Sequence, residues 1–273
     1  MNKTIVTIVL AASAGMLQAQ TYSNDFETAS DLNDFNITSP GNTYSVGSAV
    51  YSPITGQTNY LAPGAETSSP STFVLKNSVG VSANFQNTGD TAKFELWHNG
   101  TGSETVTKFH QFIGFEKSGS FLAVFGDHAD ADFSNTSEMG ILTGSIGAFS
   151  LSTQVGPFGN SGSANFDDDT WNRMRARFIY DQATDTFTIE GSIRNMGLNG
   201  TTPGNSIASF STSGVSAAGF SNTNLLPSLG FTSAQNGKEG HDLYSFEFTS
   251  APEPSSTALL GLGALGLLIR RKR

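Results

Sequence analysis

Residues 167–193 read DDDTWNRMRARFIYDQATDTFTIEGSI. From Trp171 to Tyr180 apolar and polar residues alternate, which is the period of a β-strand with one buried face. Residues 181–185 predict a turn, and the alternation resumes at Phe187 and Ile189. The stretch therefore predicts a β-hairpin. Its core-facing residues are predicted to be Met174, Ala176, Phe178 and Tyr180, and its outward residues Arg173, Arg175 and Arg177.

The same alternation recurs along the chain, while helical periodicity is almost absent. Phe94 and Leu96 share one face of a strand predicted at residues 91–97, and further strands are predicted at 107–117 and 241–248. The run SFLAVFG at residues 120–126 is apolar throughout, which predicts a central strand buried on both faces. Many short strands with glycine-rich turns predict an all-β fold, a β-sandwich of the jelly-roll type.

The hairpin at residues 167–193 resembles one in concanavalin A-like (laminin G-like) sandwiches. In that family a tryptophan opens a strand, an alternating run ends in Tyr-Asp, and a short turn leads into a second strand. Residues 24–27 and 244–248 resemble the first and last strands of the same fold. The resemblance implies that these two strands pair in one sheet.

The first 19 residues read MNKTIVTIVLAASAGMLQA and differ from the rest of the chain. Lys3 supplies a positive charge, residues 5–14 form a short apolar stretch, and Ala19 is a small residue at a cleavage position. This layout is typical of a secretory signal peptide. We expect residues 1–19 to form a signal helix that is removed on export.

The last 23 residues, APEPSSTALLGLGALGLLIRRKR, contain three blocks. Pro252, Glu253 and Pro254 cannot continue a helix. Residues 257–269 carry no charge, and as a transmembrane helix they would span only about 20 Å of a hydrocarbon core about 30 Å thick. A basic stop follows, which favours the cytoplasmic side of the membrane. It consists of Arg270, Arg271, Lys272 and Arg273.

These blocks, in this order, resemble the PEP-CTERM sorting domain of bacterial envelope proteins. The resemblance implies recognition by an exosortase, a membrane-embedded cysteine peptidase-transpeptidase, after a transient stay in the inner membrane. It also implies a Gram-negative-type envelope, often in an organism that makes exopolysaccharide. We therefore predict a signal peptide at residues 1–19, a β-sandwich domain at 20–250 and a sorting signal at 251–273.

Charge and composition limit the partners of this domain. The chain has a formal net charge of −9 and no cysteine, and five of its 14 basic residues lie in the two ends. Such an acidic surface disfavours nucleic acid and anionic lipid as partners. The lack of cysteine excludes disulfides, thiol catalysis and thiolate metal sites.

Two acidic loops are candidates for a cation. Asp127, Asp130 and Asp132 follow the predicted strand at 120–126, and residues 167–169 are three aspartates before Trp171. Calcium prefers several oxygen ligands from a flexible loop. The glycine and the distal glutamate of an EF-hand are missing, so the alternative is a solvated acidic turn. No other cofactor is predicted, and whether these loops bind calcium is left open by the sequence.

Two features are candidates for contact with glycans. Trp97 lies at a predicted strand end, where its ring could stack on a sugar. Arg173, Arg175 and Arg177 lie about 7 Å apart on one strand face, where guanidinium groups could bind an acidic polysaccharide. The alternative is a cross-strand ion pair of one arginine with Glu190.

No strand carries two acids at the spacing that a glycoside hydrolase of this fold would need, although acids from separate strands could still meet. The four histidines lie near no serine nucleophile motif. We therefore expect no enzymatic activity, and a structural or adhesive role in the envelope or exopolysaccharide. The alternatives are a lectin-like carbohydrate-binding protein and a divergent glycoside hydrolase.

Overall fold

The computed structural model describes residues 19–38, 44–47, 53–63, 71–100, 109–128, 137–146, 148–158, 170–204, 206–232 and 239–251. Within these ranges the chain forms fifteen β-strands and two short 3-10 helices, so the all-β prediction is confirmed. No helix in these ranges is long and apolar enough to cross a membrane. Residues 1–18 of the signal helix expected at 1–19, and the transmembrane helix expected at 257–269, lie outside the described residues, while Ala19 is the first residue of a β-strand.

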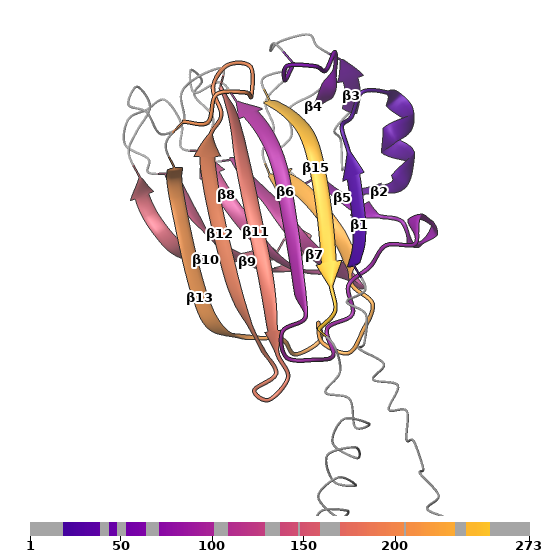
Figure 1. The fold of residues 1–273 in the computed structure, drawn as a ribbon, viewed down its shortest axis with the longest axis vertical. Helices are drawn as coiled ribbons and strands as arrows, with labels where there is room; N and C mark the ends of the chain where they lie inside the picture. The colour runs from indigo at the N-terminus through magenta and orange to yellow at the C-terminus, as the bar shows by residue number, and fades with distance from the viewer. Residues whose placement is uncertain are drawn as a thin grey trace, which may run out of the picture.

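The strands form two antiparallel sheets that pack as two layers (Figure 1). Sheet A has eight strands. Seven of them follow one another across the sheet, and the eighth, β1, is an additional antiparallel partner of β15. In order they are β13 (Ser206–Ser216), β12 (Thr186–Asn195), β11 (Trp171–Asp181), β6 (Thr91–Gly100), β15 (Glu239–Thr249), β4 (Tyr60–Pro63) and β3 (Tyr44–Gly47), with β1 (Ala19–Asn24).

Sheet B has seven strands and covers the other side of the core. In order they are β10 (Ala148–Phe158), β9 (Ser137–Ser145), β8 (Ser120–His128), β7 (Phe109–Lys117), β14 (Leu226–Thr232), β5 (Ser71–Leu75) and β2 (Phe35–Thr38). The 3-10 helices are η1 (Ala29–Asp34) and η2 (Asn77–Val79).

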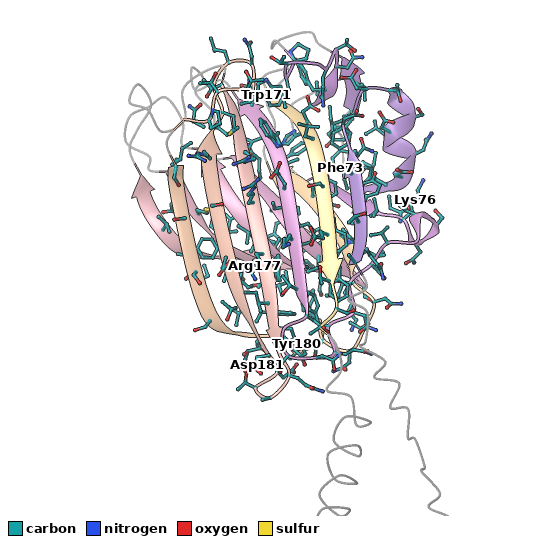
Figure 2. The ribbon with its side chains drawn as sticks, in the orientation of Figure 1. Phe73, Lys76, Trp171, Arg177, Tyr180 and Asp181 are labelled. Carbon is teal, nitrogen blue, oxygen red and sulfur yellow. The ribbon has the colours of Figure 1, made fainter. Side chains whose placement is uncertain are left out.

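The hairpin predicted from residues 167–193 is β11 and β12. Phe178 lies opposite Ile189, and both side chains are buried between the sheets. Figure 2 shows Trp171 at one end of β11, Tyr180 and Asp181 at the other end, and Arg177 between them. The period-two alternation therefore assigned the buried and outward faces of this hairpin correctly.

The prediction that residues 120–126 are buried on both faces is also confirmed. Leu122 and Val124 in β8 join the main core between the sheets. Phe121 and Phe125 lie on the opposite face of sheet B, in a second cluster with Phe112 of β7. A strand with apolar contacts on both faces needs no polar residues, which explains the unbroken apolar run.

The first and last strands pair as the family resemblance implies, because β1 runs antiparallel to β15. The predicted position of the first strand is wrong, since β1 is Ala19–Asn24 and not residues 24–27. The side chain of Asn24 accepts a hydrogen bond from the Phe26 backbone N–H at 2.8 Å, and Phe26 has a φ of 49°. This local turn ends the strand at Asn24.

Candidate functional site

A groove of about 790 Å³ crosses the outer face of sheet A. Five strands of the sheet and β1 contribute to it, because alternate residues of each strand point away from the core. Most of its uncharged outward side chains are hydroxyls. They are Thr21 and Ser23 on β1, Ser192 on β12, Ser209 and Ser211 on β13, and Ser245 on β15.

Three ion pairs cross the same face, and each joins two residues that lie directly opposite one another on neighbouring strands. Their nitrogen–oxygen distances are 2.6 Å for Arg175 with Glu95, 3.3 Å for Arg177 with Glu190, and 2.9 Å for Lys93 with Glu247. The groove is therefore locally neutral in an acidic protein. Each pair is partly exposed, so its contribution to stability is at most about 1 kcal/mol.

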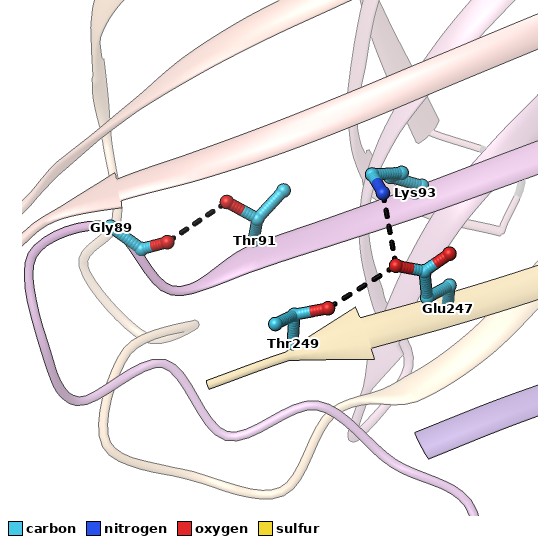
Figure 3. A network of polar contacts seen from close by, with 5 residues as sticks. All are labelled: Gly89, Thr91, Lys93, Glu247 and Thr249. Atoms are coloured by element: carbon cyan, nitrogen blue, oxygen red, sulfur yellow. Dashed lines mark hydrogen bonds and ion pairs between the residues drawn. The ribbon is translucent and has the colours of Figure 1, made fainter. Parts of the chain in front are cut away.

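Figure 3 shows one of these pairs, in which Lys93 contacts Glu247. The Thr249 hydroxyl donates a second hydrogen bond to Glu247 Oε1 at 3.2 Å. The hydrogen bond from Lys93 lowers the pKa of the Glu247 carboxyl. This carboxylate therefore stays ionised, as an acceptor of hydrogen bonds.

The three arginines predicted to share one strand face do not have the same contacts. Arg175 and Arg177 line the groove, each in an ion pair, and the pair between Arg177 and Glu190 is the cross-strand contact that the sequence left as an alternative. Arg173 instead lies over the ring of Trp97, with its guanidinium carbon 5.8 Å from the ring centroid. Burial lowers the pKa of Arg173.

The expectation that Trp97 is exposed for stacking on a sugar is wrong. Trp97 is only 7% exposed and packs in a cluster with Tyr60, Trp171 and Met196. Ile54 and Met196, which lie outside the strands, also belong to this cluster and help to bury Trp97. The Trp97 indole donates a hydrogen bond to Glu95 at 2.8 Å, so it holds a carboxylate of the groove from the neighbouring outward position of β6.

Most residues of the groove were not predicted from the sequence. The serines of β13 and the hydroxyls of β1 recur at every second residue, which is a visible signal, but only the strand order shows that they share a surface with Arg175. A smaller hollow of about 400 Å³ adjoins the groove through Ser23, Glu95 and Ser245. It adds three carboxylates to this surface, those of Asp25, Asp31 and Asp34.

The candidate calcium loops lie almost wholly outside the described residues. Only the backbone of Asp127 is described, at the end of β8, while Asp130, Asp132 and residues 167–169 fall outside. Within the ranges that the structure describes, no group of three or more histidines, aspartates or glutamates is placed to hold a metal ion. Calcium at these loops stays a prediction. The sorting residues Pro252, Glu253 and Pro254, and the basic stop from Arg270 to Arg273, also lie outside the description.

Comparison with solved structures finds lectins that are similar to this chain over most of its length. A peanut lectin with a bound 9mer peptide has 12% identity and a TM-score of 0.41, covering 86% of this chain and all of its own. A Lotus tetragonolobus seed lectin has 13% identity and a TM-score of 0.44, with coverages of 86% and 100%. Lectin II from Ulex europaeus has 15% identity and a TM-score of 0.44, with coverages of 84% and 97%. A search among curated proteins finds no match.

Comparison with protein families finds one match at the C-terminus. Residues 250–273 match the PEP-CTERM protein-sorting motif, which includes the Pro-Glu-Pro block, the apolar segment and the basic stop. Proteins with this motif are exported, and an exosortase processes them. The chain therefore carries a PEP-CTERM sorting signal and is an exported protein of the cell surface or extracellular space.

Proposed function

We propose that the β-sandwich is a non-enzymatic module that contacts polysaccharide at the cell surface or in the surrounding matrix, through the groove on sheet A. The observation that carries this proposal is the lining of the groove. Hydroxyls and three ion pairs occupy one continuous, partly open face of six strands. Its role there is adhesive or structural, and the sorting signal delivers it.

The groove can bind a sugar mainly through hydrogen bonds, because it exposes few aromatic rings for stacking. Carboxylate and guanidinium groups hydrogen-bond in planar, two-pronged geometry, which suits neighbouring hydroxyls of a sugar ring. The aromatic residues at the groove floor, Phe94 and Phe246, are buried in the core. Affinity for a single sugar should therefore be modest, and a polymer with many equivalent binding positions should bind more strongly.

The state of the groove carboxylates favours binding over catalysis. A glycosidase needs one acid whose pKa is raised, so that it can donate a proton to the leaving group. Here Glu95 accepts hydrogen bonds from Arg175 and Trp97, and Glu190 pairs with Arg177. The pKa of Glu247 is lowered by Lys93. These contacts occupy all three carboxyl groups as hydrogen-bond acceptors or ion-pair partners.

Substitution of Ser192 by tryptophan tests the groove. Ser192 lies on the outer face of β12, opposite Arg175 on one side and Ser209 on the other. Tryptophan is tolerated on a strand surface and would fill the groove without removing an ion pair. We expect the full exported protein to bind exopolysaccharide from its producing cells in affinity electrophoresis, and Ser192→Trp to weaken that binding by about tenfold or more.

The matched control is Ser150→Trp, at an exposed serine of β10 in the opposite sheet. It adds the same ring away from the groove and should bind like the wild type. Equal binding by Ser192→Trp and the wild type would show that the groove is not the site. If the wild type binds no glycan, the polysaccharide contact is refuted and a purely structural role remains.

A further inference from the structure

The two ends of the folded domain meet at one pole. Gln20, the first residue expected after signal removal, lies in β1 opposite Phe248, the penultimate residue of β15. Figure 1 shows these two strands side by side. In the sequence, Pro252 of the sorting motif follows Thr249 by three residues. The fold therefore ends almost at the start of the sorting signal.

A buried carboxylate holds the last residue before that signal. Asp90 is fully buried, and its Oδ1 accepts a hydrogen bond from the Ala251 backbone N–H at 2.7 Å. Its Oδ2 accepts two more, from the backbone N–H groups of Gln86 and Asn87 at 2.7 and 2.8 Å. One side chain thus ties a turn before β6 to a residue 161 positions further along the chain.

The turn that carries Asp90 is itself fixed to sheet A. The Tyr180 N–H donates to the Asp90 carbonyl, and the Gly89 N–H donates to the Tyr180 carbonyl. The Thr91 hydroxyl donates to the Gly89 carbonyl at 2.9 Å, as Figure 3 shows. Gly89 has a φ of 98°, and a side chain there would contact Ala251. Asp90 is therefore held rigidly at the point where the chain leaves the domain.

This arrangement limits the chain available to the processing enzyme. Cleavage after about Pro254 would leave three residues beyond Ala251, which reach at most about 11 Å when extended. A peptidase embedded in the membrane must bind an extended stretch of chain around the bond that it cuts. A folded sandwich this close to that bond obstructs such binding.

We infer that Asp90 restrains sorting, because its hydrogen bond to Ala251 must open before the exosortase can process the chain. The clamp keeps the tether short, and its release adds free chain between the domain and the Pro-Glu-Pro motif. Local opening of a strand end requires far less free energy than global unfolding, so this step is accessible in the folded protein.

The substitution Asp90→Asn tests the clamp while sparing the turn. The remaining oxygen of asparagine can accept from Gln86 and Asn87, and its amino group then faces the Ala251 N–H, which is repulsive. Loss of one hydrogen bond to a charged group should raise the population of the open end about tenfold. We expect faster processing of the full chain in cells of the producing organism, followed by pulse-chase, and faster amide hydrogen exchange at Ala251.

A flexible spacer distinguishes an effect of the Asp90 clamp from a general loss of stability in the Asp90→Asn variant. Insertion of about five Gly and Ser residues between Ala251 and Pro252 adds roughly 17 Å of chain. This spacer should speed processing of the otherwise unchanged protein, and Asp90→Asn should then have no further effect. The control Glu138→Gln changes the charge in the same way on β9, where Glu138 contacts Thr153 and not the Asp90 turn, and should process like the wild type. Slower or unchanged processing with the spacer, or an equal effect of Asp90→Asn with and without it, would overturn the inference.

Discussion

Substitution of Phe85 by alanine is expected to lower the free energy of unfolding by about 3–5 kcal/mol. Phe85 is fully buried, and its ring centroid lies within 4.8–6.1 Å of four others. Phe115 belongs to sheet B, while Tyr180, Phe187 and Phe248 belong to sheet A. Truncation therefore leaves a cavity between the layers and removes aromatic contacts that join the two sheets.

Thermal unfolding of the exported protein measures this effect. In a domain of this size each kcal/mol changes Tm by about 2–4 °C, so the expected fall is about 10 °C. The control is Leu198→Ala, because the Leu198 side chain is 61% exposed and its truncation removes little buried area. If Phe85→Ala melts within a degree or two of this control, Phe85 does not join the sheets as described.

The wild-type protein is expected to lose stability as the pH rises from about 6.5 to 8, because a buried carboxyl group, Asp242, must then ionise. Substitution of Asp242 by asparagine is expected to abolish this loss. Burial raises the pKa of the Asp242 carboxyl to about 8, although the Leu243 backbone N–H lowers it in part. Nearby Glu27 and Asp25 raise it further. With its amide reversed, Gln57 lies 2.6 Å from both carboxyl oxygens, and its hydrogen bond to the ionised form opposes this rise in pKa.

The sign of this effect follows from proton binding. Between pH 4 and 8 the folded protein holds a proton on Asp242 that the unfolded chain has released, so stability falls as the pH rises. Burial lowers the pKa of His241 to about 3, so His241 contributes the opposite slope up to about pH 6.5. Above that pH the Asp242 effect acts without this offset, and it amounts to about 2 kcal/mol by pH 8.

Melting at pH 6.5 and pH 8 therefore distinguishes the variants. The wild-type Tm should fall by about 4–8 °C between these values, and that of Asp242→Asn should stay constant. Asp181→Asn is the control, because the pKa of Asp181 is lowered and it titrates below this range. A wild type with no pH dependence here would show that the buried carboxyl is already ionised at neutral pH. An Asp242→Asn protein that keeps the dependence would assign it to another group and contradict the prediction.

Local pattern predicted the faces of the strands, because alternation is a property of each strand alone. It assigned Phe178 to the core and Arg177 to the surface, and it identified Glu190 as a partner on the next strand of the same hairpin. It could not pair Arg175 with Glu95, because β6 lies about 80 residues earlier in the chain and the order of strands is set by the whole sandwich.

Contacts that strand alternation does not reveal also explain why two predictions, for Trp97 and for the first strand, were wrong. Trp97 alternates with Lys93 and Glu95 as an outward residue, but a segment from elsewhere in the chain covers it. The first strand was predicted several residues too late, because the turn that ends it at Asn24 depends on one side-chain hydrogen bond. The contact between Asp90 and Ala251 joins residues with no shared pattern, so only the fold reveals it.

Intact-mass analysis of the protein recovered from outside the producing cells shows whether the exported β-sandwich has been separated from its C-terminal sorting signal. The expected product begins near Gln20 and ends near Pro254, so that the apolar segment and the basic stop are absent. An exported protein that still ends in Arg273 would contradict the account.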